Sequence, residues 1–248
     1  MNFLGLTFVV FFLVLMGALW VFVRSQDVQH LRQIDAFTRL QNAIALAVED
    51  GSRLHVSLGH GNLVELQAAS ALIGLHMLQR VVRVASDSDQ PPIATSGNGV
   101  TALLAQDTLR AAYQGIRRSE IYDPGQARIP GLTPFSFTVG VVPMIDDEAI
   151  STSILAGSFG EEVGLITTAA DRSNGLTLAG SEDLTAQAVF YASAGEPLIG
   201  EELYAAGAYL EAGDIHTASL HAQDILRWII ILVILGSAVV GFFLGLTS

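Results

Sequence analysis

The sequence predicts an α/β domain, built on a mixed or parallel sheet of four to five strands covered by helices, between an N-terminal and a C-terminal transmembrane helix. The first observation behind this prediction is that every charged side chain lies between Arg24 and Arg227. The second is that both ends of the chain are apolar stretches of membrane-spanning length. The third is an alternation of short apolar runs with helical patterns between those ends, which is typical of α/β proteins.

The first transmembrane helix is predicted over residues 1–23. Residues 2–23 carry no charge, and about 20 apolar residues at a rise of about 1.5 Å each span the hydrocarbon core of a bilayer. A secretory signal peptide is the alternative, but the stretch has neither a basic leading region nor a small-x-small cleavage site. We therefore expect this segment to remain as a membrane anchor.

Residues 24–50 are predicted to continue that helix as a stalk that ends at Asp50, because neither glycine nor proline occurs between Gly17 and Gly51. Apolar residues recur along it at steps of three and four and form one stripe, which consists of Val28, Leu31, Ile34, Phe37, Leu40, Ile44 and Val48. We expect this stripe to contact a second copy of the chain. Packing on the protein's own α/β body is the alternative.

The α/β domain is predicted over residues 51–214. Strands, with the turns that follow them, are expected within 53–61, 91–99, 135–145, 151–157 and 176–182. Helices are expected at 62–86, 100–116, 161–173, 183–194 and 198–213. Residues 121–134 contain three prolines and are predicted to form a loop.

Residues 215–248 are predicted to form one helix that continues into the second transmembrane span. Arg227 and Trp228 stand where a cation and an aromatic ring are favoured at the membrane interface. Small residues recur every four positions in the span, at Ser237, Gly241 and Gly245. Such a face lets two membrane helices approach closely, so we expect these three residues to pack against a neighbouring helix.

The arginines that flank the two spans predict the orientation of the chain. Arg24, Arg32 and Arg39 follow the first span, and Arg227 precedes the second. No basic residue lies on the other side of either span. The positive-inside rule therefore places the middle domain in the cytoplasm and both termini outside.

Glycine-rich turns where strands end are the candidate sites for a small molecule, because ligands of α/β folds bind at the carboxyl ends of strands. The candidate side chains on these turns are His60, Ser96, Asn98 and Glu161. A phosphate ligand is not expected, because the chain has no lysine and no Gly-x-x-x-x-Gly-Lys motif. Acidic residues also stand at helix starts, where they would repel a phosphate: Glu161, Glu162, Glu182 and Asp183. We therefore expect no nucleotide or other cofactor.

Local motifs for catalysis or metal binding are absent from the sequence. There is no Gly-x-Ser-x-Gly elbow, no His-x-x-x-His pair and no cysteine. We therefore assign no catalytic residue and no metal ligand, and we expect residues 146–148, Asp-Asp-Glu, to form a solvated turn.

The charge distribution limits the partners. The net charge is −12, and residues 129–224 carry fourteen acidic residues against a single cation, Arg172. Such a surface repels nucleic acid, so nucleic acid is not an expected partner. Charged residues are also sparse in the middle region compared with a typical soluble domain, which favours a surface covered by other subunits.

The segment SEDLTAQAVFYASAGEPLIGEELYAAGAYL, followed by HTASLHAQDILRW and a closing apolar span, resembles an uncharacterised family of bacterial membrane proteins known as a domain of unknown function. The resemblance extends back through LHVSLGHG and PPIATSGNG and covers most of residues 50–245. It implies a bacterial membrane protein, and together with the two predicted spans we expect the inner (plasma) membrane. It implies no activity and no catalytic residues.

Two functions are compatible with these patterns. The first is a structural or assembly protein anchored in the membrane, either a homo-oligomer or a subunit of a larger membrane complex. The second is a membrane-tethered enzyme or small-molecule sensor that uses the glycine-rich turns at the strand ends. Convergence of His60, Ser96, Asn98 and Glu161 on one cleft would favour the second.

Overall fold

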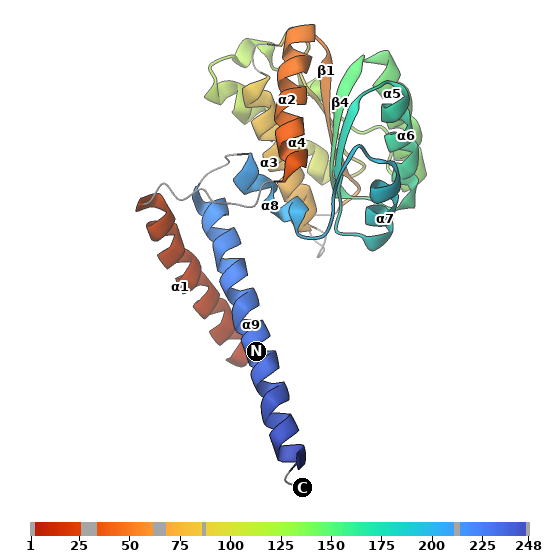
Figure 1. The fold of residues 1–248 in the computed structure, drawn as a ribbon. Coiled ribbons are helices and arrows are strands. Elements are labelled where there is room, and N and C mark those ends of the chain that lie inside the picture. Colours follow the sequence, from red (N-terminus) through yellow and green to blue (C-terminus); the bar gives the residue numbers. More distant parts are fainter. Residues whose placement is uncertain (1–2, 26–33, 62–67, 86–87, 211–213, 247–248) are drawn as a thin grey trace. The chain divides into compact units, whose positions relative to one another are not determined.

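A computed structural model describes residues 3–25, 34–61, 68–85, 88–210 and 214–246, and the chain divides into two compact units. The first unit contains the terminal helices α1 (Phe3–Ser25) and α9 (Asp214–Leu246), which pack side by side (Figure 1). The stretch Thr217–Ala238 of α9 is long and apolar enough to cross a membrane, by length and composition alone. The apolar stretch of α1, Gly5–Val21, is shorter.

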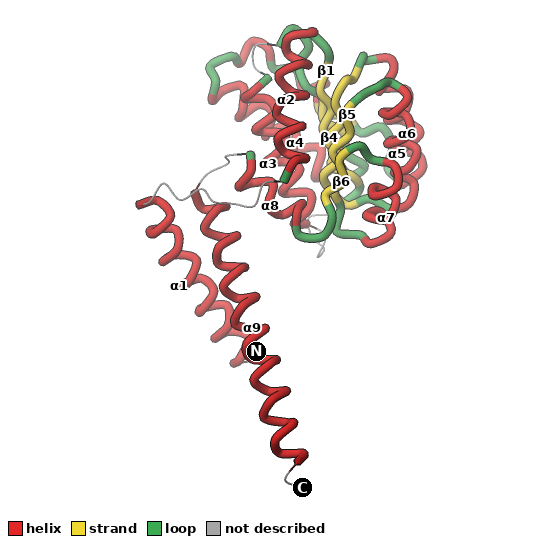
Figure 2. The backbone as a smooth tube through the Cα atoms, in the orientation of Figure 1, coloured by secondary structure: helices red, strands yellow, loops and turns green. Residues whose placement is uncertain are grey.

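The second unit, residues 32–210, is an α/β body around one six-stranded sheet. Its strands lie in the order β3-β2-β1-β4-β5-β6, and every neighbouring pair is parallel (Figure 2). Their bounds are β1 Arg53–Gly59, β2 Ile93–Thr95, β3 Ala127–Arg128, β4 Ile150–Ser158, β5 Leu176–Gly180 and β6 Glu196–Leu198. The predicted α/β class is confirmed. The sheet is fully parallel and has six strands rather than four to five.

Helices cover both faces of this sheet (Figure 1). On one face lie α2 (Asp35–Asp50), α3 (Ala68–Val84), α4 (Gly99–Gly115) and α8 (Glu202–Tyr209). On the other lie α5 (Pro134–Asp147), α6 (Gly164–Arg172) and α7 (Leu184–Ser193). Three short 3-10 turns complete the body: η1 Ser119–Ile121, η2 Pro124–Gln126 and η3 Glu161–Val163. Each face has its own apolar cluster.

The two apolar clusters follow from the period of two in a strand. In β4, Ile154 and Ala156 belong to the cluster beneath α2 and α3, whereas Leu155 between them belongs to the cluster beneath α5 and α6. Six of the seven residues of β1 and seven of the nine residues of β4 are buried. Strands covered on both sides in this way are typical of the centre of a parallel sheet.

Residues 135–145, predicted as a strand, instead belong to helix α5, so this prediction is wrong. Thr133 and Ser136 form a capping box at its start, and Pro134 occupies the first turn. The apolar residues that it buries, Phe137, Val141 and Ile145, recur every four positions, which is a helical spacing. The high content of Phe, Val and Thr suggested a strand, but the cap and the burial of this face determine a helix.

The apolar stripe predicted for the stalk packs on the α/β body. Phe37, Leu40 and Ile44 of α2 are buried in the core, and Ile34 and Val48 pack against its edge. The ring of Phe37 stacks on Tyr209 of α8 with 5.1 Å between ring centroids. Over the described residues the stripe therefore packs within the chain and not against a second copy. Val28 and Leu31, and the junction between α1 and α2, lie outside the described residues.

The predicted C-terminal helix is continuous from Asp214 to Leu246 as α9. Ser237 is exposed, and its hydroxyl donates a hydrogen bond to the carbonyl of Ile234 at 2.8 Å, within the same helix. Gly241 and Gly245 also lie in α9. The packing of these three residues against another helix stays a prediction.

Candidate functional site

The candidate site lies at the carboxyl edge of the sheet, between β1 and β4. Strand order reverses at this point, since β1 leads outward to β2 and β4 leads outward to β5. In doubly wound sheets of this order, ligands bind in the crevice that opens there. Gly59 ends β1 with a φ of +65°, and an added Cβ would collide with the carbonyl of Ser158 on β4. Only glycine fits this approach.

The turn after β2 folds onto the end of β1. The backbone N–H of Gly97 donates to the carbonyl of Gly59 at 2.9 Å. The buried hydroxyl of Ser96 accepts a hydrogen bond from the N–H of Asn98 at 3.1 Å. The side chain of Asn98 then caps α4 by accepting from Val100 N at 2.9 Å. The turn is therefore fixed by its own polar groups.

His60, directly after β1, is the side chain on which the neighbouring turns converge. Its ring meets the edge of Phe137 on α5 with 4.6 Å between centroids. An added Cβ on Gly97 would collide with the ring, so the β2 turn lies against it. On the other side, Nδ1 of His60 lies 3.7 Å from Oε1 of Glu162, in the turn after β4. The site therefore joins the ends of β1, β2 and β4 with one residue of α5.

Burial determines the charge state of this histidine. The side chain of His60 is 17% exposed and that of Glu162 is 6% exposed. Burial lowers the pKa of His60 below its ordinary value, although the Glu162 carboxylate and the backbone of Ser158 act in the opposite direction. His60 is therefore neutral at pH 7. Its Nε2 is buried and has no hydrogen-bond partner among the described residues.

Three of the four candidates from the sequence, His60, Ser96 and Asn98, lie together at this edge. The fourth, Glu161, is exposed, and its neighbour Glu162 occupies the position beside His60. Glu162 turns inward because its Oε1 accepts the N–H of Gly160 at 3.0 Å. In the sequence, the only sign that Glu162 and not Glu161 turns inward is Gly160, whose backbone N–H can bond to a side chain two positions later.

Two of the helices that start at this edge, α4 and α7, are capped by side chains, whereas α6 has no side-chain cap. Asn98 caps α4, and Asp183 caps α7 by accepting from Thr185 N at 2.8 Å and Ala186 N at 3.0 Å. Glu162 occupies the N–H of Gly160. These N–H groups are the ones that would otherwise hold a phosphate. The start of the segment between β1 and α3, residues 62–67, lies outside the described residues.

Ion pairs elsewhere have a structural role. Glu148, expected in a solvated turn, is instead held by Arg53 of β1 and by Arg128, whose Nη1 lies 2.7 Å from Oε1. The hydrogen bond from Arg128 holds the pKa of the Glu148 carboxyl below its ordinary value. Among the described residues no group of three His, Asp or Glu side chains is arranged to hold a metal ion.

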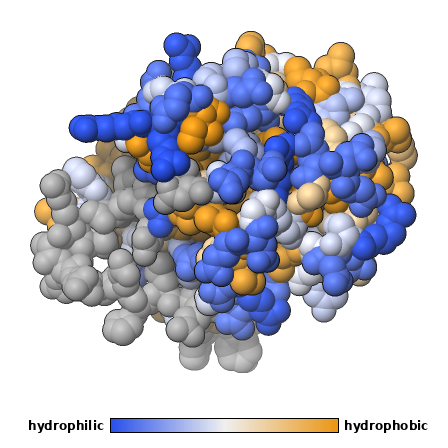
Figure 3. All heavy atoms as spheres, turned by 90° about the horizontal axis from the view of Figure 1, so that it is seen from above, coloured by the Kyte–Doolittle hydropathy of each residue, from blue (hydrophilic) through white to orange (hydrophobic). Residues whose placement is uncertain are grey.

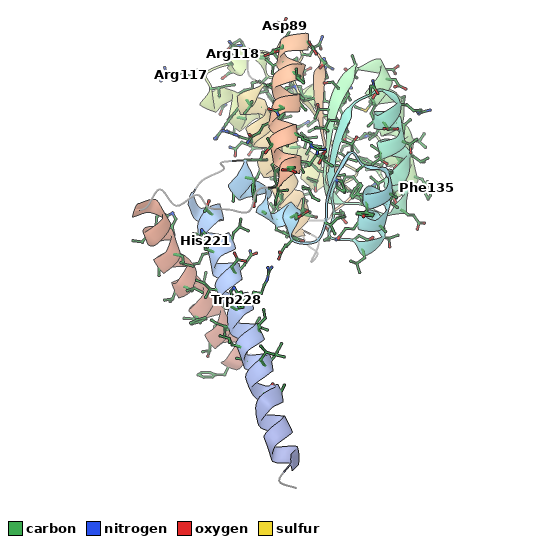
Figure 4. The ribbon with its side chains drawn as sticks, in the orientation of Figure 1. Asp89, Arg117, Arg118, Phe135, His221 and Trp228 are labelled. Carbon is green, nitrogen blue, oxygen red and sulfur yellow. The ribbon has the colours of Figure 1, made fainter. Side chains whose placement is uncertain are left out.

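A second notable surface is the outer side of α5, α6 and α7. Phe135 of α5 points away from the body (Figure 4), and it is 62% exposed. Leu184 and Tyr191 of α7 are still more exposed. Seen from above, apolar residues recur along this side of the molecule (Figure 3). A contiguous patch of such side chains would be typical of a contact surface.

Comparison with known proteins gives a family and no activity. The family model described as "Domain of unknown function (DUF6754)" matches residues 1–247. Neither the curated proteins nor the solved structures contain a match to this chain.

Proposed function

Because the chain belongs to the DUF6754 family, whose description assigns no activity, we propose from its geometry that it is a membrane-anchored domain that binds a small molecule at the carboxyl edge of its sheet. Both a sensor and a tethered enzyme would first bind the small molecule at this site. The observation that carries this proposal is the convergence of His60, Ser96 and Glu162 at the reversal of strand order.

The charges at this edge define the class of ligand. Glu162 is the carboxylate beside His60, which is itself neutral, and the starts of α4 and α7 are capped by side chains. An uncharged or cationic polar molecule fits these groups, whereas a phosphate would meet a carboxylate. The unpartnered Nε2 of His60 is the acceptor that such a ligand would satisfy once the edge opens.

Thermal unfolding of the full chain with a panel of sugars, polyols, amino alcohols and polyamines tests this proposal. A ligand at about 100 times its dissociation constant raises the midpoint by about 5–10 °C in a domain of this size. Glu162→Gln is expected to remove most of the shift, because it removes the charge but keeps the acceptor for Gly160. Glu161→Gln, at the exposed neighbouring position, is the matched control. If every hit stabilises both variants equally, this edge is not the binding site.

Nucleotides are expected to leave the chain unaffected. ATP, GTP and NAD at millimolar concentration, with and without magnesium, should produce no shift in the unfolding midpoint, because Asn98, Glu162 and Asp183 occupy the N–H groups of their turns. A saturable stabilisation above about 1 kcal/mol would contradict this expectation.

We also propose that α1 and α9 both cross the inner membrane of a bacterium, with the α/β body in the cytoplasm and both termini outside. The apolar stretch of α9 and the arginines at 24, 32, 39 and 227 support this topology. Protease added to intact spheroplasts should leave residues 32–210 uncut and should cut them after lysis. Cleavage within the body before lysis would contradict this topology and place the body outside the cytoplasm.

Assembly with other copies, or with other membrane-complex subunits, is the second candidate function. The exposed side chains Phe135, Leu184 and Tyr191 on α5 and α7 favour it. Sizing of the particle extracted in mild detergent tests it. Phe135→Glu with Tyr191→Glu should reduce an oligomer to the monomer, whereas Leu103→Glu, at an exposed position of α4, should not. A wild-type protein that is monomeric and free of other subunits in the native membrane would exclude assembly.

A further inference from the structure

The layer of α5, α6 and α7 has α6 in its middle, and its helices carry charge only where they end (Figure 1). All residues of the three helices are described. Their charged residues are the last two of α5 and the last two of α6: Asp146, Asp147, Asp171 and Arg172. Helix α4, on the opposite face of the sheet, instead carries exposed charges along its length, at Asp107 and Arg110. The middle of the α5–α7 layer is therefore uncharged.

The uncharged middle of this layer is also apolar and exposed. Leu165 of α6 is 52% exposed, Val139 of α5 is 65% exposed and Tyr191 of α7 is 77% exposed. Val139 and Leu165 line one groove together with Thr168, so the exposed side chains of α5 and α6 adjoin. Apolar and aromatic side chains with no charge among them are typical of the buried core of a protein–protein interface, whereas the solvated side of a helix carries charges.

Opposite charges stand at the two ends of α6. Glu161 begins the turn η3 that leads into α6, and Arg172 is the last residue of α6. Both residues are exposed, and among the described residues neither makes a side-chain hydrogen bond or an ion pair. They are eleven positions apart, about 16 Å along a helix. The midpoint between them lies between the exposed positions Leu165 and Thr168, so the two charges are placed symmetrically about the centre of the outer side of α6.

A second copy of the chain can face this layer about a two-fold axis in two ways, since α5, α6 and α7 all run in the same direction across the parallel sheet. With the axis along α6 the helices of the two copies are parallel, so Arg172 meets Arg172 and Glu161 meets Glu161. With the axis across α6 the helices are antiparallel, so each Arg172 meets a Glu161, and Leu165 lies beside Thr168 at the axis. Like charges that meet at an interface oppose binding, and opposite charges fix its register. The charges of α6 therefore select the antiparallel arrangement.

The ends of α5 and α7 are compatible with the same arrangement. In it α5 faces α5, so Asp146 and Asp147 meet the start of α5 in the second copy, which begins Pro-Phe-Ser and carries no charge. The N-terminal end of a helix favours such acids. The start of α7, where Asp183 is exposed, meets the end of α7, which carries no charge either. Like charges of these helices therefore stay apart.

We propose that the outer side of α5, α6 and α7 binds a second copy of this chain in the antiparallel arrangement. Leu165 and Thr168 lie at the two-fold axis, and Arg172 of each copy pairs with Glu161 of the other. A surface whose charges pair with themselves under a two-fold rotation is what an isologous dimer requires. The inference deepens the second candidate function, assembly, on which it rests, and it is independent of the ligand site at His60.

Single cysteines test the arrangement in the full chain, because the sequence contains no cysteine. In mild detergent, a short bis-maleimide should cross-link two copies of Thr168→Cys, because the axis places these positions side by side. It should join neither two copies of Arg172→Cys nor two of Glu161→Cys, whose positions lie at opposite ends of the interface. A mixture of the last two variants should cross-link. Asp107→Cys, at an exposed position of α4 on the opposite face of the sheet, is the control that should stay uncross-linked.

Charge reversal tests the two ion pairs. Arg172→Glu and Glu161→Arg should each raise the dissociation constant of the dimer about tenfold or more, measured by sizing across a dilution series. The two changes together in one chain should restore the dissociation constant to within about threefold of wild type, because the pairs form again with the charges exchanged. Asp107→Arg with Arg110→Glu, on α4, is the matched control and should leave the dissociation constant unchanged.

Four results would overturn the proposal. Cross-linking of Arg172→Cys with itself would show that the helices are parallel. A dimer that Thr168→Cys does not cross-link, and that every charge variant leaves intact, would show that assembly uses another face of the chain. A different protein cross-linked through Thr168→Cys would show that this face binds another subunit. A wild-type chain that is monomeric and free of other subunits would contradict both this arrangement and assembly itself.

Discussion

His55, in the middle of β1, is a fully buried titratable residue whose protonation opposes folding. Its Nε2 lies 2.8 Å from Oγ1 of Thr95, and its Nδ1 has no partner among the described residues. Burial and, to a smaller extent, the nearby charge of Arg128 together lower the pKa of His55 to about 4. The folded protein therefore keeps this ring neutral at a pH where the unfolded chain binds a proton.

The free energy of unfolding should fall as the pH decreases from about 6.5, the ordinary histidine pKa, to about 4, the folded value. Between pH 6.5 and pH 4 the unfolded state binds a proton that the folded state does not bind. The free energy of unfolding should therefore be lower at pH 4 than at neutral pH by about 3 kcal/mol. Urea unfolding of wild type and His55→Asn measures this, with His76→Asn, at an exposed position of α3, as the control. An equal pH slope in all three proteins would contradict the assignment.

Glu148 also loses its stabilisation as the pH falls, because its folded pKa is lowered by the hydrogen bond from Arg128 and by the charge of Arg53. Its stabilisation is present above the ordinary carboxyl pKa and is lost as the pH falls through the folded value. Glu148→Gln should destabilise the fold by about 1–3 kcal/mol at pH 7, since two partly buried arginines lose their carboxylate. Asp147→Asn, at the exposed neighbouring position, should change stability by less than about 0.5 kcal/mol.

Helix α2 is the clearest case of an element whose pattern could be predicted while its partner could not. The spacing of Phe37, Leu40 and Ile44 predicts one apolar face, and the structure buries that face. The partner depends on where the chain returns, because Tyr209 of α8, which stacks on Phe37, is 172 positions away in the sequence. A stripe can be read from a local period, whereas the surface that covers it is set by the topology of the whole sheet.

Leu40→Ala should destabilise the α/β body by about 2–5 kcal/mol, because Leu40 is completely buried and the cavity is flanked by sheet and helix. Leu46→Ala, on the exposed side of the same helix, should cost less than about 1 kcal/mol. Urea unfolding at pH 7.5 compares the two. Equal and small effects would mean that α2 is held away from the core, as a separate stalk would be.

Helix α5 and the site at the carboxyl edge mark the limits of local patterns. The composition of residues 135–145 favours a strand, and only the capping box at Thr133 and Ser136 identifies a helix. At the edge of the sheet, His60 and Ser96 are predictable because they directly follow strands. Glu162 is not, because its inward turn depends on a hydrogen bond to Gly160 that forms only in the folded turn. Phe137 is not predictable either, because it lies in the segment whose composition favours a strand.

At the scale of the whole molecule, the apolar cores lie within one of the two units. Both clusters of buried apolar residues that the structure describes are drawn from Ile34 to Leu210, which is the span of the α/β unit. The strands pair only with one another. The net negative charge of this unit also favours solubility.

A fragment of residues 32–210 is therefore expected to fold without the terminal helices and to remain soluble. Its free energy of unfolding should lie within about 1 kcal/mol of that of the full chain, and it should show the same loss of stability between about pH 6.5 and 4, because His55 keeps its surroundings. Urea unfolding and sedimentation measure both properties. A fragment that is expanded or aggregates would mean that the core depends on α1 or α9. A fragment that is folded and oligomeric would assign the subunit contacts to the α/β unit, whereas a folded monomer beside an oligomeric full chain would assign them to the terminal helices.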